Sequence, residues 1–323
     1  MPTRAASTLL DSVVDYAGLF PPAKLPMQAA VEAYARDRVG PEAWMLGRFV
    51  CPASRLEEFS KAASPLLPGT FATSGYREHA AGHGGGEPWQ LSVLADGVGE
   101  TDAADGLRRD LDRIAAFNTR HAHEDLGLAV VDTLEIKPPT PDLVDQVWDE
   151  IPDDIFPFFE IPAEGDARGF IAALPGHGAA AKIRTGAVTA EGFPSPQRVA
   201  LFLEACRLAD IPFKATAGLH HAMRGEYPLT YEAGSPKGVM FGFLNLLVAA
   251  TLAHAHRVEA SVLVDCLTEK EARAFTLTDD GLSWRRLVVD VTEIARAREV
   301  FSVSFGSCSF EEPVAELRSL SLL

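Results

Sequence analysis

Short apolar stretches alternate along the chain with longer segments that have helical periodicity. The apolar stretches predict eight strands, which cover residues 44–51, 90–95, 131–137, 155–161, 180–185, 211–216, 274–277 and 302–307. Two of the intervening segments open with helix-start signals, because Ser195 precedes a proline and Ser309 precedes Glu312 at capping-box spacing. Strands separated by helices pair in parallel through right-handed crossovers. The pattern therefore predicts an α/β fold with a parallel sheet.

Eight strand–helix units favour a closed (β/α)8 barrel, the TIM-barrel architecture, which typically takes ~250 residues. Within the 323 residues of the chain, we expect residues 1–40 to form an N-terminal helical extension and residues 41–323 to form a single barrel domain. We expect loop insertions in addition to the barrel, and residues 83–86, which include three consecutive glycines, lie in the most flexible-looking of these loops. Segment 274–277 is the weakest strand, since residues 274–284 also fit a hairpin beside an incomplete barrel. An open, doubly wound sheet is the competing architecture.

The charge balance narrows the range of partners. Lys and Arg total 29 against 45 Asp and Glu, which gives a formal net charge of −16. A field of this sign repels phosphate backbones and anionic lipid headgroups, so we expect neither nucleic acid nor a membrane surface as a partner. A small anionic substrate is not excluded, because it senses mainly the charges of its own pocket.

Cysteine usage and the most apolar window of the sequence bear on the cellular location of the protein. Four scattered cysteines without metal-ligand spacing suit a reducing environment, and we expect a cytoplasmic location. The most apolar window, residues 238–253, is shorter than the ~20 residues of a membrane span and contains Asn245. It predicts a buried helix, with a homo-oligomer contact as the second use of such a segment.

Charged residues recur near the carboxyl ends of four consecutive predicted strands. Side chains alternate between the two faces of a strand, so the positions between helix-facing apolar residues point into the barrel. The inward set comprises Glu135, Lys137, Lys182, Arg184 and Lys214, with Thr216 beside them and Glu160 at the end of a strand that is apolar on both faces. Desolvating an isolated ion costs several kcal/mol, so we expect these groups to meet at the end where barrel enzymes build their sites. An ion-pair network that only fills the barrel is the alternative.

Such a cluster suits amine chemistry. A lysine held near other cations and away from water loses its proton more easily, and its neutral amine attacks carbonyl groups. We expect this of Lys214, with a pKa depressed by Lys182 and Arg184. Glu160 or Glu135 would carry protons during the reaction. Arg184, with the backbone amides of residues 217–219, is expected to hold a carboxylate or a phosphate.

The segment Lys214-Ala-Thr-Ala-Gly218 resembles the K-x-S/T-x-G segment of deoxyribose-phosphate aldolases. In that class I aldolase family the Schiff-base lysine lies on strand six. The resemblance implies a lyase that acts on a small carbonyl-containing anion through Lys214 and needs no cofactor. The family also has a helper lysine on strand seven and a glycine-rich phosphate loop late in the barrel. Neither has a counterpart in residues 274–277 or 305–309, and Lys182 is the candidate to replace the helper.

Two alternatives to an aldolase stay open. His220 and His221 follow the Gly218 turn directly, where a barrel loop overhangs its pocket. They are either pocket contacts or, with Glu160 or Glu135, ligands of a divalent metal in a metal-dependent hydrolase or lyase. The other alternative is a non-catalytic barrel that binds a small anion or a protein partner.

Further binding candidates lie at the two ends of the chain. Ser307, at the end of the last predicted strand, is expected to contact substrate together with Arg184, Thr216, Gly218, His220 and His221. Residues 15–22 (DYAGLFPP) join the two N-terminal helices, and the sequence leaves open whether Asp15 or Tyr16 reaches the pocket.

Overall fold

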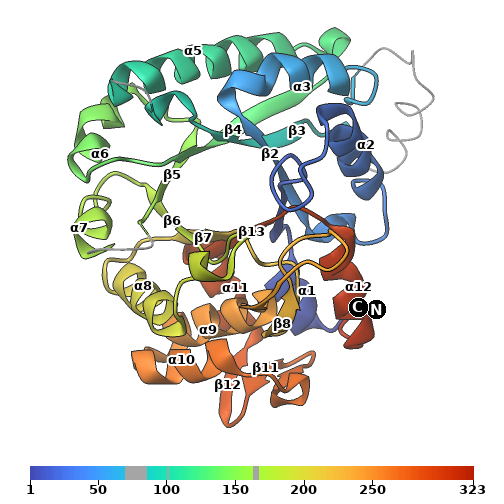
Figure 1. Cartoon of the computed structure of the whole chain (residues 1–323), viewed down its shortest axis with the longest axis vertical. Helices are drawn as coiled ribbons and strands as arrows, with labels where there is room; N and C mark the ends of the chain where they lie inside the picture. The colour runs from blue at the N-terminus through green and yellow to red at the C-terminus, as the bar shows by residue number, and fades with distance from the viewer. Residues whose placement is uncertain (70–85, 100–101, 163–166) are drawn as a thin grey trace.

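The chain closes a barrel of eight parallel strands, which confirms the (β/α)8 fold (Figure 1). The structure is a computed structural model that describes residues 1–69, 86–99, 102–162 and 167–323. Around the barrel the strand order is β1-β13-β7-β6-β5-β4-β3-β2. The strands are β1 (Val14–Tyr16), β2 (Leu46–Pro52), β3 (Trp89–Leu94), β4 (Ala129–Ile136), β5 (Phe156–Glu160), β6 (Ala180–Arg184), β7 (Phe213–Thr216) and β13 (Ser302–Ser307). The predicted loop at residues 83–86 lies outside the described residues except for Gly86.

Helices surround the barrel in Figure 1, and several begin where the sequence predicts. They are α1 (Arg4–Leu10), α2 (Met27–Asp37), α3 (Leu56–Ala63), α5 (Ala103–His121), α6 (Asp142–Val147), α7 (Ala167–Ala172), α8 (Pro196–Leu208), α9 (Phe243–His256), α10 (Ala260–Thr268), α11 (Val291–Val300) and α12 (Glu311–Ser319). The Ser195 hydroxyl accepts from the backbone N–H of Arg198 and caps α8. Ser309 likewise accepts from the backbone N–H of Glu312 at α12.

The barrel differs from the prediction at the strand that closes it. Residues 275–277 form β10 (Phe275–Leu277), which pairs antiparallel with β11 (Gly281–Trp284), and β11 pairs with β12 (Leu287–Asp290). This small sheet is separate from the barrel, so the hairpin alternative for this segment is correct. The barrel closes instead through β1, which pairs with β13 on one side and β2 on the other.

Strand β1 also changes the predicted domain boundary. Residues 1–40 contribute two helices, as expected, but they also contribute this barrel strand, so they are not an extension separate from a barrel at 41–323. Strand β1 is difficult to predict from the sequence because the strand has only three residues and its central residue, Asp15, is charged. The remaining seven predicted strands lie in the barrel, and their ends agree with the structure to within two residues.

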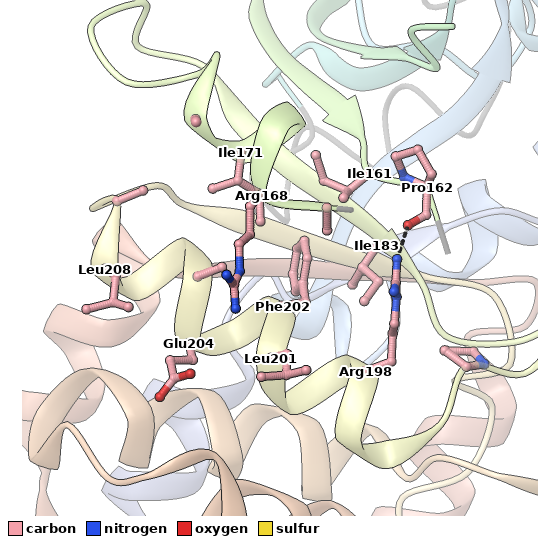
Figure 2. Close-up of a pocket in the computed structure, with 15 residues that line it drawn as sticks. Ile161, Pro162, Arg168, Ile171, Ile183, Arg198, Leu201, Phe202, Glu204 and Leu208 are labelled. Atoms are coloured by element: carbon pink, nitrogen blue, oxygen red, sulfur yellow. Dashed lines mark hydrogen bonds between the residues drawn. The ribbon is translucent and has the colours of Figure 1, made fainter. Parts of the chain in front are cut away.

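Outward-facing side chains fix which residues of β6 point into the barrel. Ile183 lies on the outer side of β6 and lines a groove of about 540 Å³ between α7 and α8, with Phe202 opposite (Figure 2). Because alternate side chains of a strand point to opposite faces, Lys182 and Arg184 point inward. The alternation predicted for this strand is therefore confirmed.

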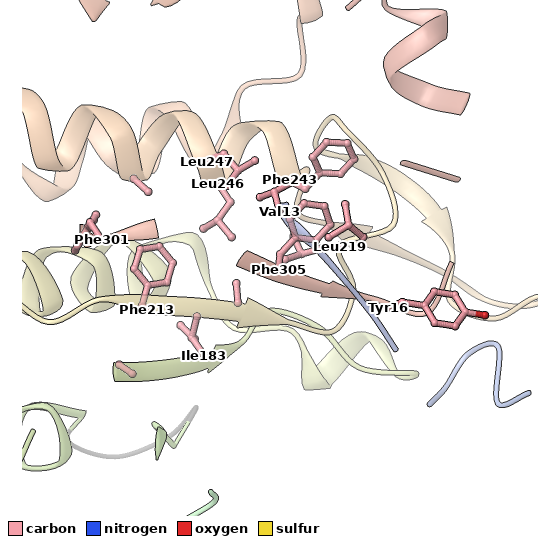
Figure 3. Packing of buried hydrophobic residues seen from close by; sticks show 14 of the residues in the cluster. Val13, Tyr16, Ile183, Phe213, Leu219, Phe243, Leu246, Leu247, Phe301 and Phe305 are labelled. Atoms are coloured by element: carbon pink, nitrogen blue, oxygen red, sulfur yellow. The ribbon is translucent and has the colours of Figure 1, made fainter. Parts of the chain in front are cut away.

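The apolar window forms the buried helix α9, which covers β7 and β13. Residues 243–253 of α9 are all buried, and Figure 3 shows Phe243 and Leu246 over the two strands. Phe243 stacks on Phe305 of β13 with ring centroids 4.9 Å apart, and Phe213 of β7 packs edge-on against Phe301 at 5.1 Å. None of the described helices combines the length and the apolar content that a membrane span requires.

Candidate functional site

A cavity of about 270 Å³ opens at the carboxyl ends of the barrel strands. Its charged and polar lining comes from β4, β6 and the ends of β7 and β13. Its apolar lining comes from the loop after β1, the ends of β2 and β3, the loop after β6, and the hairpin of β8 (Gly225–Pro228) and β9 (Lys237–Met240). The lining residues are Ala17, Phe20, Pro21, Pro22, Val50, Leu94, Glu135, Lys182, Arg184, Ala187, Val188, Thr216, Ala217, Gly218, His220, Leu229, Met240, Gly306 and Cys308.

Two buried lysines share one carboxylate at the floor of this cavity. The Glu135 carboxylate lies 2.8 Å from Lys182 Nζ through Oε2 and 2.7 Å from Lys214 Nζ through Oε1. The second partner of Lys182 is Glu160, at 2.9 Å. Lys182 and Lys214 are register partners on neighbouring strands, which explains why one carboxylate reaches both. The predicted meeting of these four charged residues is therefore observed.

The fifth member of the network is Asp15, from the centre of β1. Its Oδ2 lies 2.6 Å from Lys214 Nζ and accepts from the Ser304 hydroxyl at 2.7 Å, while Oδ1 accepts from the backbone N–H of Arg48. The sequence does not decide whether Asp15 reaches the pocket, because its pattern places residues 15–22 between two helices and outside the barrel. The available signal was an acidic residue within an otherwise apolar VVDYAGLF stretch.

Lys214 does not have the depressed pKa that the sequence predicts. Burial of its ammonium group opposes the charged form, but Asp15 and Glu135 outweigh burial and raise the pKa. The expectation of mutual repulsion among cations is wrong because each lysine has two carboxylates within 2.9 Å. Lys214 is fully buried and is not among the residues that line the cavity, whereas Lys182 is.

Glu135 is held in its charged form. Burial of the carboxyl raises its pKa, but Lys182 and Lys214 outweigh that effect and lower the pKa well below the ordinary range. The Ser92 hydroxyl also donates to Glu135, at 2.7 Å. Glu135 therefore acts as a fixed negative charge between the two ammonium groups.

Arg184 and Thr216 lie above the network, and Lys137 lies outside it. Arg184 is exposed at the cavity rim, where it makes no ion pair with any described residue. Thr216 Oγ1 is buried, and no hydrogen-bond partner for it exists in the described part of the chain. Lys137 was expected to point inward, but it follows the end of β4 and is exposed.

The two histidines turn to different partners. His220 lines the cavity, and its Nδ1 lies 3.5 Å from the Ser307 hydroxyl and 3.6 Å from the Cys308 thiol. Burial, with a smaller effect of His221, lowers the pKa of His220 to about 4. His221 instead stacks on Tyr227 with ring centroids 3.5 Å apart and hydrogen-bonds to Glu316.

Some of the residues predicted to contact substrate line the cavity, and others do not. Gly218 and His220 line the cavity, but His221 does not, and Ser307 lies behind His220. Within the described ranges, no three His, Cys, Asp or Glu side chains gather closely enough to hold a metal ion. The metal hypothesis thus lacks a ligand set among these residues, since the imidazoles of His220 and His221 face separate groups.

The N-terminal segment does reach the pocket. Phe20, Pro21 and Pro22 line the cavity, and Asp15 belongs to the network beneath it. The larger groove on the outer side of β6 contains none of the five network residues. The cavity at the strand ends is therefore the candidate active site.

Comparisons of the chain with protein-family models, with curated proteins and with solved structures each found no match.

Proposed function

We propose that the protein is a lyase in which the amine of Lys182 forms a Schiff base with a small carbonyl compound. The supporting observation is that Lys182, between Glu135 and Glu160, is the one lysine among the described residues that line the cavity. Lys214 is enclosed beneath it by Asp15 and Glu135. This assignment moves the nucleophile from Lys214, which the sequence favours, to Lys182.

The corrected strand count agrees with this assignment. With β1 as the first strand, Lys182 is on strand six and Lys214 is on strand seven. The aldolases that the chain resembles have the Schiff-base lysine and the helper lysine on those two strands. Each lysine is followed four residues later by a glycine, and a Cβ added to Gly186 would lie 2.7 Å from the Cα of Gly218. The two strand ends thus approach each other closely beside the lysines.

In the proposed reaction Glu160 transfers the protons, and Glu135 stabilises the positive charge. Glu160 accepts a proton from the Lys182 ammonium, and the neutral amine then attacks the carbonyl carbon. Glu160 returns the proton to the carbinolamine oxygen, which leaves as water and yields an iminium ion. The bond between the α- and β-carbons then breaks: a β-hydroxyl group gives its proton to Glu160 and leaves as the carbonyl of the second product, while the electron pair of the broken bond forms an enamine. Protonation of the enamine at the α-carbon by Glu160 and hydrolysis of the resulting iminium by water release the first product and free Lys182. Glu135, which Lys214 helps to keep in its charged form, stabilises the positive charge of the iminium.

The test is borohydride trapping followed by peptide mapping. Borohydride reduces an iminium to a stable secondary amine, so a trapped aldehyde or 2-oxo acid adds a defined mass to one lysine. We expect the mass on the peptide that contains Lys182, and we expect its loss in Lys182→Met. Lys137→Met, at an exposed lysine near the same barrel end, is the matched control and retains the adduct.

Two results would overturn the proposal. One is the absence of any reduction-dependent adduct on Lys182 across the carbonyl panel with folded protein. The other is an adduct that maps to Lys214 and persists in Lys182→Met. Circular dichroism of each variant establishes that it is folded before it is scored.

A further inference from the structure

We infer that the substrate is a carboxylate with an apolar body, held at the rim by Arg184 and Thr216, and not a phosphorylated sugar. The carbonyl part of this inference rests on the proposed function. The anion-binding part rests on separate residues and is tested separately. The sequence predicts only a small anion as substrate. The inference specifies that the anionic group is a carboxylate and that the rest of the molecule is apolar.

Arg184 is the cation in the lining that the network does not neutralise. It lies two residues beyond Lys182 on the same face of β6, about 6.6 Å further along the strand at a rise of about 3.3 Å per residue. Lys182 already has two carboxylate partners, whereas Arg184 has no ion-pair partner among the described residues. An anion in the cavity therefore gains most from Arg184, whose planar guanidinium matches a carboxylate through two parallel hydrogen bonds.

Thr216 offers a hydroxyl at the same level. Arg184 and Thr216 are register partners on β6 and β7, so both face the same depth of the cavity. The Thr216 methyl group faces Gly306, since a Cβ added there would lie 3.4 Å from Thr216 Cγ2. Its buried Oγ1 has no partner in the described part of the chain. Because buried hydroxyl oxygens almost always have a hydrogen-bond partner, rotation of this side chain toward the cavity would allow a ligand oxygen to supply the missing one.

The other walls of the cavity favour hydrocarbon. Phe20, Leu94, Val188, Leu229 and Met240 come from five separate segments and surround the polar floor. The hydroxyl groups of a sugar would lose hydrogen bonds to water against these side chains without replacing them. An aliphatic or aromatic substituent gains from the same contact because its apolar surface leaves water.

The charge of the lining opposes a phosphate dianion. Phosphate esters carry roughly −1.5 to −2 charges at neutral pH. Among the described residues that line the cavity, Arg184 is the cation without an ion-pair partner, and Glu135 adds a negative charge. A single carboxylate matches this balance better than a dianion does. The cavity of about 270 Å³ lies at the small end of ligand pockets, which suits a short chain or a single ring.

The first experiment measures binding without Schiff-base chemistry. Isothermal titration calorimetry compares hexanoate, hexanamide and inorganic phosphate on the wild-type protein, Arg184→Gln, Thr216→Val and the control Lys137→Gln. Hexanoate is expected to bind at least tenfold more tightly than hexanamide or phosphate. Arg184→Gln should weaken hexanoate binding about ten- to a hundredfold, as expected for the loss of a charge-assisted hydrogen-bonded pair. Thr216→Val should weaken it several-fold, and Lys137→Gln should not change it.

The second experiment compares trapping by borohydride among 2-oxohexanoate, hexanal and glyceraldehyde 3-phosphate. Faster trapping of 2-oxohexanoate supports the inference. Faster trapping of the phosphorylated aldehyde on Lys182 refutes it while supporting the proposed function. Hexanoate binding that depends on Arg184, without any trapping, supports the carboxylate site and refutes the Schiff base. Hexanoate binding that is unchanged in Arg184→Gln refutes the carboxylate site.

Discussion

Replacing Lys214 by methionine tests whether the buried network is organised by opposite charges. The substitution removes an ammonium group that lies 2.6 Å from Asp15 and 2.7 Å from Glu135, while the side chain keeps a similar length. Asp15 then loses its ammonium partner, and Glu135 and Glu160 keep only the ammonium of Lys182. Removing one partner of a buried ion pair costs about 3–5 kcal/mol, because the other partner is left buried and unpaired. We expect this loss in the free energy of unfolding, measured by urea denaturation with circular dichroism.

The loss should depend on pH. In the wild-type protein the lowered pKa of Glu135 gives stability that is present above the unfolded value of about 4.3 and is lost as the pH falls through the folded value. Without Lys214, the crowded carboxyl groups bind protons more readily in the folded state than in the unfolded state. Stability then declines as the pH rises. Lys214→Met should therefore lose more stability, relative to wild type, at about pH 8 than at about pH 5.

A double variant sharpens this test. Asp15→Asn/Lys214→Met removes one charge of each sign, so the effect of the lysine change should be about 1–3 kcal/mol smaller in the Asp15→Asn background. Lys137→Met is the control for loss of an exposed lysine and should change stability by less than about 0.5 kcal/mol. A Lys214→Met loss below about 1 kcal/mol, the same loss at both pH values, or strict additivity with Asp15→Asn would contradict the charge argument.

Three further outcomes follow from groups around the cavity. Because burial lowers the pKa of His220 to about 4, stability should fall by at most about 3 kcal/mol from this residue as the pH drops from about 6.5, and His220→Gln should flatten that slope in urea titrations. The four cysteines are buried, and burial raises their pKa values, so iodoacetamide should label the native protein far more slowly than the urea-unfolded protein; fast native labelling would contradict this. Gly218→Ala should cost more than Gly234→Ala in Tm, since both have φ near +70° to +80° but only the first would place a Cβ 2.9 Å from a backbone atom; equal shifts would exclude a role for the close approach.

Strand alternation was sufficient to predict most of the network. Leu134, Ile183 and Ala215 face outward, and this placed Glu135, Lys182 and Lys214 on the inner surface. Alternation gives the face of a strand but not the distance to charges on other strands. It therefore brought the lysines together correctly, yet it could not show that carboxylates separate them. For that reason the sequence predicts a lowered pKa for Lys214, whereas in the structure its pKa is raised.

The strand that closes the barrel was the larger omission. β1 has three residues, and its central residue is charged, so neither its length nor its hydrophobicity exceeds that of an ordinary loop. Segment 274–277 took its place in the predicted count because it has the apolar and β-branched residues of a strand. Omitting β1 lowered the numbers of the next six barrel strands by one, whereas the last strand, β13, kept its number as the eighth. The two lysines were thus assigned to strands five and six instead of six and seven.

The pairing of β1 with β13 has a consequence for the newly made chain. Asp15 and Ser304 hydrogen-bond across this seam although they lie 289 positions apart. During synthesis β1 leaves the ribosome long before its neighbour β13 has been made. Until β13 pairs with β1, the sheet is not closed around the Asp15 carboxylate, which pairs with Lys214 in the finished protein. The charged floor of the cavity is completed only when the last strand docks. A nascent or C-terminally truncated chain therefore lacks the assembled site, however much of the barrel has already formed.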